Sequence, residues 1–254
     1  MQIPIVMAVF GTTSRAKATY RSIDDQVRKA FPGHEIHWAY SSRMVKGLAK
    51  QDETIRHPHE ILRKLSGEGH PWAVVQSVHL IGGHEFHRLL REVREESIRT
   101  SVGLPLLTSP DDHIRTGRCL APIIDSHPGK AILLIGHGTD HPSWTAYPAF
   151  QQALRQIYGN RVFVGSVEEF PLSDGIVAEI AAAGFKEVLL IPFLLVAGIH
   201  YRKDLMSDEE DSWSSRLRNA GIAMEAIPDG IGILPCIGEI FCDHIRDALD
   251  IIPL

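Results

Sequence analysis

The chain alternates between strand-like and helix-like segments along its whole length. The first segment, residues 3–10, is a continuous apolar run rich in β-branched residues, and it ends at Gly11-Thr12-Thr13-Ser14. Such a run is typical of a strand buried in a parallel sheet and followed by a helix cap. Repeated strand–helix units predict βαβ connections and parallel sheets. The pattern predicts strands over residues 3–10, 35–40, 72–81, 104–107, 131–135, 162–167, 188–196 and 223–227, and helices over 16–31, 58–66, 85–96, 112–124, 148–157, 174–183, 212–220 and 238–249.

The two halves of the chain resemble each other. A Gly-Thr pair follows the first strand of each half, and a tyrosine lies nine residues beyond each glycine, Tyr20 in one half and Tyr147 in the other. We therefore expect two Rossmann-like α/β halves, residues 1–127 and 128–254, related by a pseudo-two-fold axis, with the last helix able to pack back on the first half. Open α/β sheets bind ligands at the carboxyl ends of their strands. An active-site cleft between the halves is the expected position of the ligand.

Length and composition place the chain among ordinary globular proteins. Its 254 residues are 44% hydrophobic and 22% charged, which excludes disordered and fibrous classes. The net charge of −5 gives no sign of nucleic-acid binding, for which a basic balance is usual. No apolar run approaches the roughly 20 residues of a membrane span, and residues 3–10 lack the flanks of a signal peptide. We expect a cytoplasmic protein with no nucleic-acid or membrane partner, unless a signal was removed before residue 1.

Histidine is abundant and cysteine is scarce, with 14 His against 3 Cys. The cysteines lack CxxC spacing, so metal ligands would be His and carboxylates rather than thiolates. His137, Glu168 and His200 each follow a strand of the second half, and adjacent strand ends can bring the three together. Two imidazoles and a carboxylate suit Co²⁺, Ni²⁺, Fe²⁺ or Zn²⁺ and leave positions open for substrate. The corresponding polar residues of the first half are Thr12, Ser41 and Glu85.

Other features have less specific interpretations. The glycine turns after the strands fit neither GxGxxG nor GxxxxGK[ST], so a nucleotide site is not indicated. His79 lies in an apolar strand, where a buried, hydrogen-bonded ring is the simplest interpretation, and His84 and His87 flank Glu85. The acidic run over residues 207–212 predicts a solvated loop with a helix cap. Basic residues near strand ends, suited to pairing with a polycarboxylate, are Arg15, Arg43, Lys46, Arg88, Arg202 and Lys203.

Short motifs at the ends of the predicted strands, together with two later segments, are distributed along nearly the whole chain: Phe10-Gly11-Thr12, Gln76-Ser77-Val78-His79, Gly83-His84-Glu85-Phe86, Gly136-His137-Gly138, Val164-Gly165-Ser166-Val167-Glu168 and Leu195-Val196-Ala197-Gly198-Ile199-His200, with residues 208–213 and 216–221. In this order they resemble the anaerobic sirohydrochlorin cobaltochelatases of the CbiK type. The resemblance implies the class II chelatase fold, with two Rossmann-like halves around an active-site cleft, and the ATP-independent insertion of Co²⁺ into the tetrapyrrole sirohydrochlorin.

The resemblance also implies roles for individual residues. In that family the metal is bound by a His in the GHG turn, a Glu after the next strand and a His after LVAG, which here are His137, Glu168 and His200. Glu85 is implicated in catalysis together with the two histidines. Where the family often has an acidic residue, this chain has His84. The residues expected to contact the tetrapyrrole are Phe10, Thr12 and Tyr147.

Several alternatives stay open at this point. Co²⁺ is the expected substrate metal, with Fe²⁺ or Ni²⁺ as alternatives, and no ATP is expected. A haem at a subunit interface, through His79, is a further alternative, as is a second metal at His84 or His87. The same residues would serve a sirohydrochlorin ferrochelatase or a non-catalytic carrier of metal or tetrapyrrole. The expected partners are sirohydrochlorin and further copies of the chain, since many soluble enzymes form symmetric oligomers.

Overall fold

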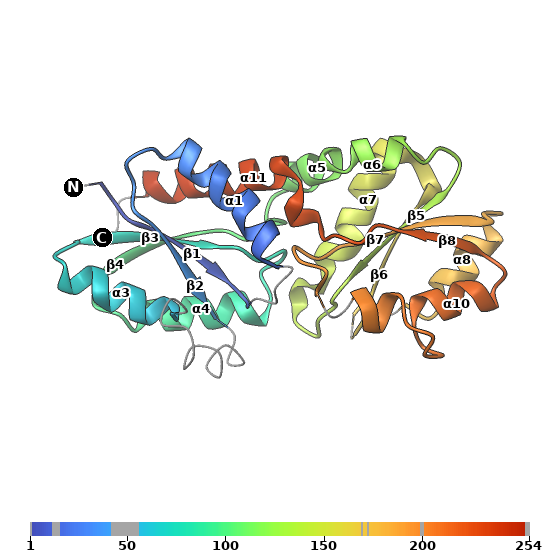
Figure 1. Ribbon diagram of the computed structural model, residues 1–254, viewed down its shortest axis with the longest axis horizontal. Coiled ribbons are helices and arrows are strands. Elements are labelled where there is room, and N and C mark those ends of the chain that lie inside the picture. Colours follow the sequence, from blue (N-terminus) through green and yellow to red (C-terminus); the bar gives the residue numbers. More distant parts are fainter. Residues whose placement is uncertain are drawn as a thin grey trace. The chain divides into compact units, whose positions relative to one another are not determined.

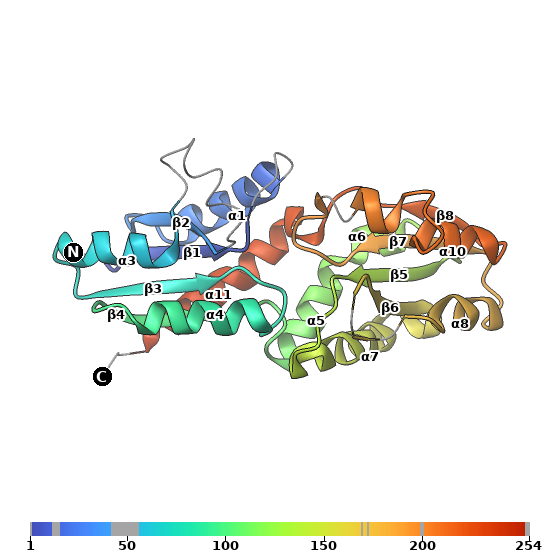
Figure 2. The same cartoon turned by 90° about the horizontal axis from the view of Figure 1, so that it is seen from below.

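A computed structural model of the chain describes residues 2–11, 16–41, 56–168, 170–171, 173–198 and 201–251 (Figures 1 and 2). The chain divides into two compact units, one formed by Met1–Thr108 with Pro235–Leu254 and the other by Ser109–Leu234. The division falls at Ser109, whereas the expected boundary lies between residues 127 and 128. In the described part of the chain, no helix is both long and apolar enough to cross a membrane.

The first unit is a parallel sheet covered by helices on both faces. Its strands β1 (Ile5–Val9), β2 (Ile36–Tyr40), β3 (Trp72–Ser77) and β4 (Arg99–Gly103) form, among the described residues, a four-stranded sheet of order β2-β1-β3-β4. Strand β1 is buried along its whole length, as its apolar run predicts. Helices α1 (Ala16–Ala30) and α11 (Pro235–Asp250) cover one face, and α3 (Pro58–Gly67) and α4 (His84–Arg94) cover the other (Figure 1).

The last helix, α11, is held on the first unit by polar bonds as well as apolar packing. The Ser101 hydroxyl in β4 donates to the Ala248 carbonyl at 2.6 Å, and His244 Nδ1 lies 2.9 Å from the Leu104 carbonyl. Ile237, Ile240, Phe241 and Ile245 of this helix are buried. The end of the chain therefore completes the helical layer that α1 begins.

The second unit repeats this strand order. Strands β5 (Ala131–Gly136), β6 (Val162–Ser166), β7 (Glu187–Pro192) and β8 (Ala223–Ala226) pair in parallel in the order β6-β5-β7-β8. Leu133, Ile135 and Leu190 form one apolar core with α8 (Ile176–Ala182) and α10 (Trp213–Asn219). The described part of the unit also contains α5 (Pro110–Cys119), α6 (Ala121–Asp125) and α7 (Ala146–Tyr158). The repeat inferred from the two Gly-Thr segments is thus a repeat of topology.

Packing of α5 on α7 explains why the division falls at Ser109. The Tyr158 hydroxyl at the end of α7 donates to the Gly117 carbonyl of α5 at 2.9 Å. A Cβ on Gly117 would lie 3.1 Å from the Leu154 side chain, so the two helices approach closely. In the sequence, α5 follows the last strand of the first half, which is why the expected boundary lies after it. In the structure α5 packs on α7, so it belongs to the second unit.

One expected strand is displaced along the chain. The apolar residues 104–107 predict a strand, but β4 is Arg99–Gly103. Pro105 has no N–H to donate to a ladder, and the amides of Leu106 and Leu107 instead donate to the carbonyls of His79 and Leu80 at 2.9 and 2.8 Å. Residues 104–107 are therefore a loop whose leucines 106 and 107 are buried. The predicted strand over 188–196 is also shorter, since β7 ends at Pro192.

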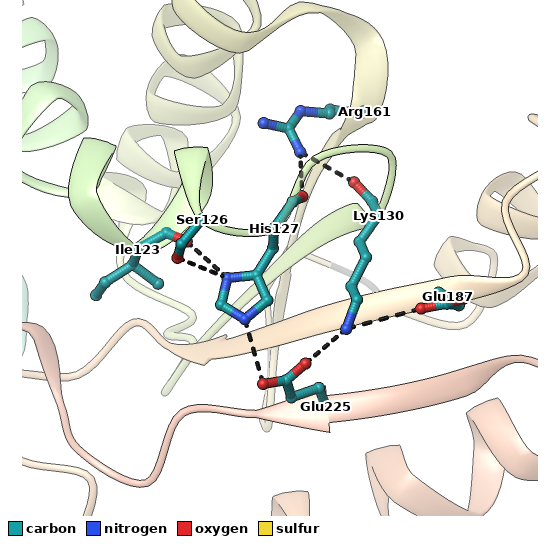
Figure 3. A network of polar contacts seen from close by, with 7 residues as sticks. All are labelled: Ile123, Ser126, His127, Lys130, Arg161, Glu187 and Glu225. Atoms are coloured by element: carbon teal, nitrogen blue, oxygen red, sulfur yellow. Dashed lines mark hydrogen bonds and ion pairs between the residues drawn. The ribbon is translucent and has the colours of Figure 1, made fainter.

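A network of ion pairs lies where the strands of the second sheet begin (Figure 3). Lys130, just before β5, places Nζ 2.5 Å from a Glu225 carboxylate oxygen and 3.7 Å from Glu187. His127 Nε2 lies 3.2 Å from the other Glu225 oxygen, and Arg161 donates to the His127 carbonyl at 3.0 Å. Hydrogen bonds from Lys130 and His127 lower the pKa of Glu225. The network thus links the starts of β5, β6 and β7 to Glu225 in β8. It lies at the end of these strands opposite to their carboxyl ends.

Candidate functional site

The carboxyl ends of β5 and β6 bring together two of the residues expected to bind metal. His137 directly follows β5, and Glu168 follows β6 by two residues. The Glu168 amide donates to the His137 carbonyl at 2.9 Å, and the Val167 amide donates to the Gly136 carbonyl at 2.9 Å. Both side chains are exposed. These two hydrogen bonds extend the strand ladder and bring the backbones of His137 and Glu168 together at the carboxyl ends of β5 and β6.

Gly138 allows this close approach of the two turns. Its φ is 89°, a conformation that residues with a Cβ rarely adopt. A Cβ at this position would lie 1.7 Å from the Glu168 carbonyl oxygen and 2.9 Å from the Ser166 Cβ. The GHG turn therefore needs glycine at its third position because the backbone of Glu168 passes directly against it.

Tyr147 supports the same turn from within the unit. Its hydroxyl accepts a hydrogen bond from the Gly138 amide at 3.2 Å, and its ring packs on Phe193, with 6.3 Å between ring centroids. Only 2% of the residue is exposed, and burial raises the pKa of the phenol. The expectation that Tyr147 packs on a macrocycle does not fit this burial.

The third expected ligand, His200, lies outside the described residues, as does Thr12. Within the described part of the chain, no group of three or more His, Cys, Asp or Glu side chains is arranged to hold a metal ion. Of the three expected ligands, the structure therefore shows only His137 and Glu168, which are neighbours through their backbones. The position of His200 after β7 is known from the sequence alone.

The carboxyl edge of the first sheet contains Glu85, in the first turn of α4 after β3. Its carboxylate is paired with the Arg88 guanidinium. The same Arg88 Nη2 donates to the carbonyl of Ser41, the residue after β2, at 2.9 Å. The Ser41 amide in turn donates to the Val9 carbonyl of β1 at 2.8 Å. Glu85 is thereby linked through one guanidinium to the ends of two neighbouring strands.

Phe10 follows β1 on the same edge and is 49% exposed. The next residue, Gly11, accepts a hydrogen bond through its carbonyl from the Tyr20 hydroxyl at 2.9 Å. An exposed phenyl ring beside a fixed turn suits contact with a flat apolar ligand. Phe10 therefore remains an expected tetrapyrrole contact.

His79 follows β3 and has one nitrogen bonded and one without a partner. Its Nδ1 lies 2.8 Å from the Ser77 hydroxyl, whereas its buried Nε2 has no hydrogen-bond partner among the described residues. Burial lowers the pKa of His79 to about 4, and the positive charge of Arg88 adds to this effect. The ring is therefore neutral near pH 7. His84 and His87 are exposed on α4, and His87 lies edge-on to Phe86.

The remaining polar features have structural roles or lie outside the described residues. The acidic run ends in a helix cap, because the Ser212 side chain accepts from the Ser215 amide at 3.2 Å. Among the basic residues expected near the strand ends, Arg88 is paired within the chain. Arg15, Arg43, Lys46 and the side chain of Arg202 lie outside the described part of the structure.

Two aromatic residues that the sequence did not single out follow His137 and Glu168 in the chain. Trp144 lies in a short 3₁₀ helix, Pro142–Thr145, after the His137 turn, and Phe170 lies two residues after Glu168. Their ring centroids are 5.9 Å apart. The signal available in the sequence was an aromatic residue soon after each ligand, but only the structure shows that the two rings meet.

Comparison with known proteins shows the family. Residues 4–250 match the family model described as cobalt chelatase (CbiK). The chain is 30% identical to a sirohydrochlorin cobaltochelatase of Nitratidesulfovibrio vulgaris, over 96% of this chain and 90% of that protein. It is 29% identical to a sirohydrochlorin cobaltochelatase of Salmonella typhimurium, over 98% of this chain and 97% of that protein.

Solved structures show the same fold. The sirohydrochlorin chelatase SirB of Bacillus subtilis subspecies spizizenii, in complex with cobalt, superposes with a TM-score of 0.68 at 15% identity, covering 98% of this chain and 95% of that one. SirB of Bacillus subtilis with Fe³⁺ gives a TM-score of 0.69 at 13% identity, with 98% and 96% covered. The match over residues 4–250 and the 30% identity to a relative over 96% of the chain show that the chain belongs to the CbiK family of cobalt chelatases.

Proposed function

We propose that this chain inserts Co²⁺ into sirohydrochlorin without ATP. The observation that carries the proposal is the pairing of His137 with Glu168 at the carboxyl edge of the second sheet, through a 2.9 Å backbone hydrogen bond, in a member of the cobalt chelatase family. Two relatives similar over nearly their full length are named sirohydrochlorin cobaltochelatases. Residue types and family membership thus point to the same reaction.

The proposed ligands of the substrate Co²⁺ are His137, Glu168 and His200. Nδ1 of His137 lies 3.3 Å from the Gly138 carbonyl, and when Nδ1 donates to this oxygen, Nε2 carries the lone pair that a metal requires. Imidazole nitrogen suits Co²⁺, and a carboxylate offsets part of its charge. Three protein ligands leave coordination positions for water and for the pyrrole nitrogens.

The reaction exchanges two pyrrole N–H protons for one Co²⁺. As nitrogen–cobalt bonds form, the ion leaves His137 and His200, and the released imidazoles accept the two protons. Glu85 assists proton removal or orients the ring, and its carboxylate is held in place by Arg88. When the protein holds Co²⁺ and the macrocycle close together, the two no longer have to meet by diffusion. The ion then only exchanges protein ligands for pyrrole nitrogens within one complex.

The test is anaerobic Co²⁺ insertion, followed by the shift of the tetrapyrrole Soret band. His137→Ala and Glu168→Gln are each expected to lower the rate by about 10²-fold or more. His127→Ala and Glu225→Gln, in the ion-pair network at the other end of the same strands, provide matched controls that keep the rate. Wild-type rates in a His137→Ala, His200→Ala double variant would overturn the assignment.

Two further measurements separate the alternatives. Parallel rates with Co²⁺ and Fe²⁺ distinguish a cobaltochelatase from a ferrochelatase. Many turnovers per protein molecule distinguish an enzyme from a carrier, which would stop after one equivalent of bound tetrapyrrole.

A further inference from the structure

Two aromatic rings meet beside the proposed ligands of the second unit. Trp144 and Phe170 have ring centroids 5.9 Å apart at an interplanar angle of 38°. Phe170 is 40% exposed, and Trp144 is partly buried. The pair therefore presents exposed ring surface on the same turns that carry His137 and Glu168.

The backbone under both rings is tied to the turns that present His137 and Glu168. The Thr139 amide, in the His137 turn, donates to the Phe170 carbonyl at 3.1 Å. On the other side of Phe170, the Ser166 hydroxyl at the end of β6 donates to the Pro171 carbonyl at 2.8 Å. The ring of Phe170 is therefore carried on a backbone that both strand ends hold.

Trp144 is fixed in a similar way. Its amide donates to the His141 carbonyl at 2.8 Å, and the Ser143 amide donates to His141 Nδ1 at 3.1 Å. The His141 amide donates to the Thr139 hydroxyl at 3.1 Å, which ties this segment back to the His137 turn. Because these hydrogen bonds fix the backbone that carries both rings, little backbone entropy would be lost on binding.

We propose that Trp144 and Phe170 form an aromatic platform on which the flat face of the tetrapyrrole substrate stacks. The proposal rests on the proposed function, because it takes sirohydrochlorin as the ligand. A conjugated macrocycle offers a large π-face, and aromatic side chains stack on such faces in offset or tilted arrangements. The platform is bonded to the turns of His137 and Glu168, so stacking there would set the macrocycle beside the metal.

In this proposal Trp144 and Phe170 make the contact with the tetrapyrrole that the sequence predicts for Tyr147. Tyr147 is 2% exposed, whereas Phe170 is 40% exposed on the same unit. Tyr147 and Trp144 both follow the GHG turn, but the buried one supports the turn and the partly exposed one pairs with Phe170.

The test measures binding of metal-free sirohydrochlorin by its absorbance and by quenching of tryptophan fluorescence. Trp144→Ala and Phe170→Ala are each expected to raise the Kd and the KM for the tetrapyrrole roughly 3- to 10-fold. Trp144→Phe keeps a ring and most of the affinity but loses a large part of the quenching. Trp72→Phe is the matched control, because Trp72 lies at the start of β3 in the other unit and its replacement should leave the Kd unchanged.

Two readouts separate stacking from a merely structural role. Co²⁺ affinity, titrated without tetrapyrrole, should stay at the wild-type value in all these variants. Phe170→Leu retains apolar volume and fold, and should still weaken tetrapyrrole binding about 3-fold. Unchanged Kd in Phe170→Leu and in a folded Trp144→Ala, Phe170→Ala double variant would overturn the platform.

The same experiment distinguishes failure of the platform from failure of the proposed function. A wild-type protein that binds sirohydrochlorin but inserts no Co²⁺ refutes the function. The platform is then tested by binding alone: a raised Kd in the variants supports it, and an unchanged Kd refutes it. Insertion at the wild-type rate and KM in the double variant refutes the platform and leaves the function intact.

Discussion

The hydroxyl of Tyr147 accepts a hydrogen bond from the amide of Gly138, nine residues earlier, at 3.2 Å. The first unit has the same spacing, but its Tyr20 hydroxyl donates to the Gly11 carbonyl at 2.9 Å. In each unit a helix that follows the first strand thus reaches back to the turn at the end of that strand. The repeat has kept the contact between turn and helix while the direction of the hydrogen bond differs.

Removal of the Tyr147 hydroxyl should loosen the His137 turn. Tyr147→Phe keeps the packing on Phe193 but leaves the Gly138 amide without its partner, which costs about 1 kcal/mol of unfolding free energy. Urea unfolding measures this cost, and steady-state Co²⁺ insertion should show a lower kcat. Tyr20→Phe makes the same change in the first unit. Equal stability of wild type and Tyr147→Phe would show that the bond contributes nothing.

Gly138 should tolerate alanine much less well than a glycine of similar φ in open space. Gly184 has φ 84° and nothing within 4 Å of an added Cβ, so Gly184→Ala should cost only the backbone strain of about 1–2 kcal/mol. Gly138→Ala adds a Cβ 1.7 Å from the Glu168 carbonyl oxygen, so the two turns must separate. We expect it to cost about 2 kcal/mol more than the control. Thermal unfolding of both variants checks the difference, and equal losses would contradict the close approach.

Arg88 should act on the reaction through Glu85. Arg88→Ala removes both the carboxylate pairing and the bond to the Ser41 carbonyl, so Glu85 loses its fixed position. We expect kcat for Co²⁺ insertion to fall about tenfold, since misplacement of a reacting group is costly. Arg63→Ala is the control, because the exposed Arg63 makes a two-bond pair with Glu96 in the same unit.

A double-mutant cycle tests whether Arg88 and Glu85 act as one unit. In a Glu85→Gln background, Arg88→Ala should change kcat little further, because the group that it positions is already altered. Fully additive losses would show that Arg88 acts independently of Glu85.

His79 should make the protein less stable in mild acid. Its folded-state pKa is about 4, against 6.5 for the exposed ring, so between these values the unfolded chain binds more protons than the folded one. Stability is therefore lost as the pH falls below about 6.5, by about 2 kcal/mol at pH 5. Urea unfolding at pH 7 and pH 5 measures this loss, which should be smaller in His79→Gln. An identical pH dependence of the two proteins would contradict a buried neutral ring.

The fold follows from the sequence to a large extent because its signals are local. The fully apolar runs of β1 and β5 match strands buried along their whole length. Helix ends marked by glycine, such as Gly33 and Gly184, have the positive φ that this residue allows. The strand expected over 104–107 was wrong because apolar character marks burial, and Leu106 and Leu107 are buried in a loop. The pairing of Arg99–Gly103 with β3 depends on a partner distant in sequence.

The sequence by itself determined the order of strands and helices, the repeat of the Gly-Thr turns and the placement of His137 and Glu168 after neighbouring strands. These features depend on residue type and on spacing along the chain. Tertiary structure decided that Tyr147 is buried, that Trp144 meets Phe170 and that Arg88 joins Glu85 to Ser41. Each of these depends on contacts between segments far apart in the chain or on which face of an element is covered, because burial and pairing are set only when the elements pack.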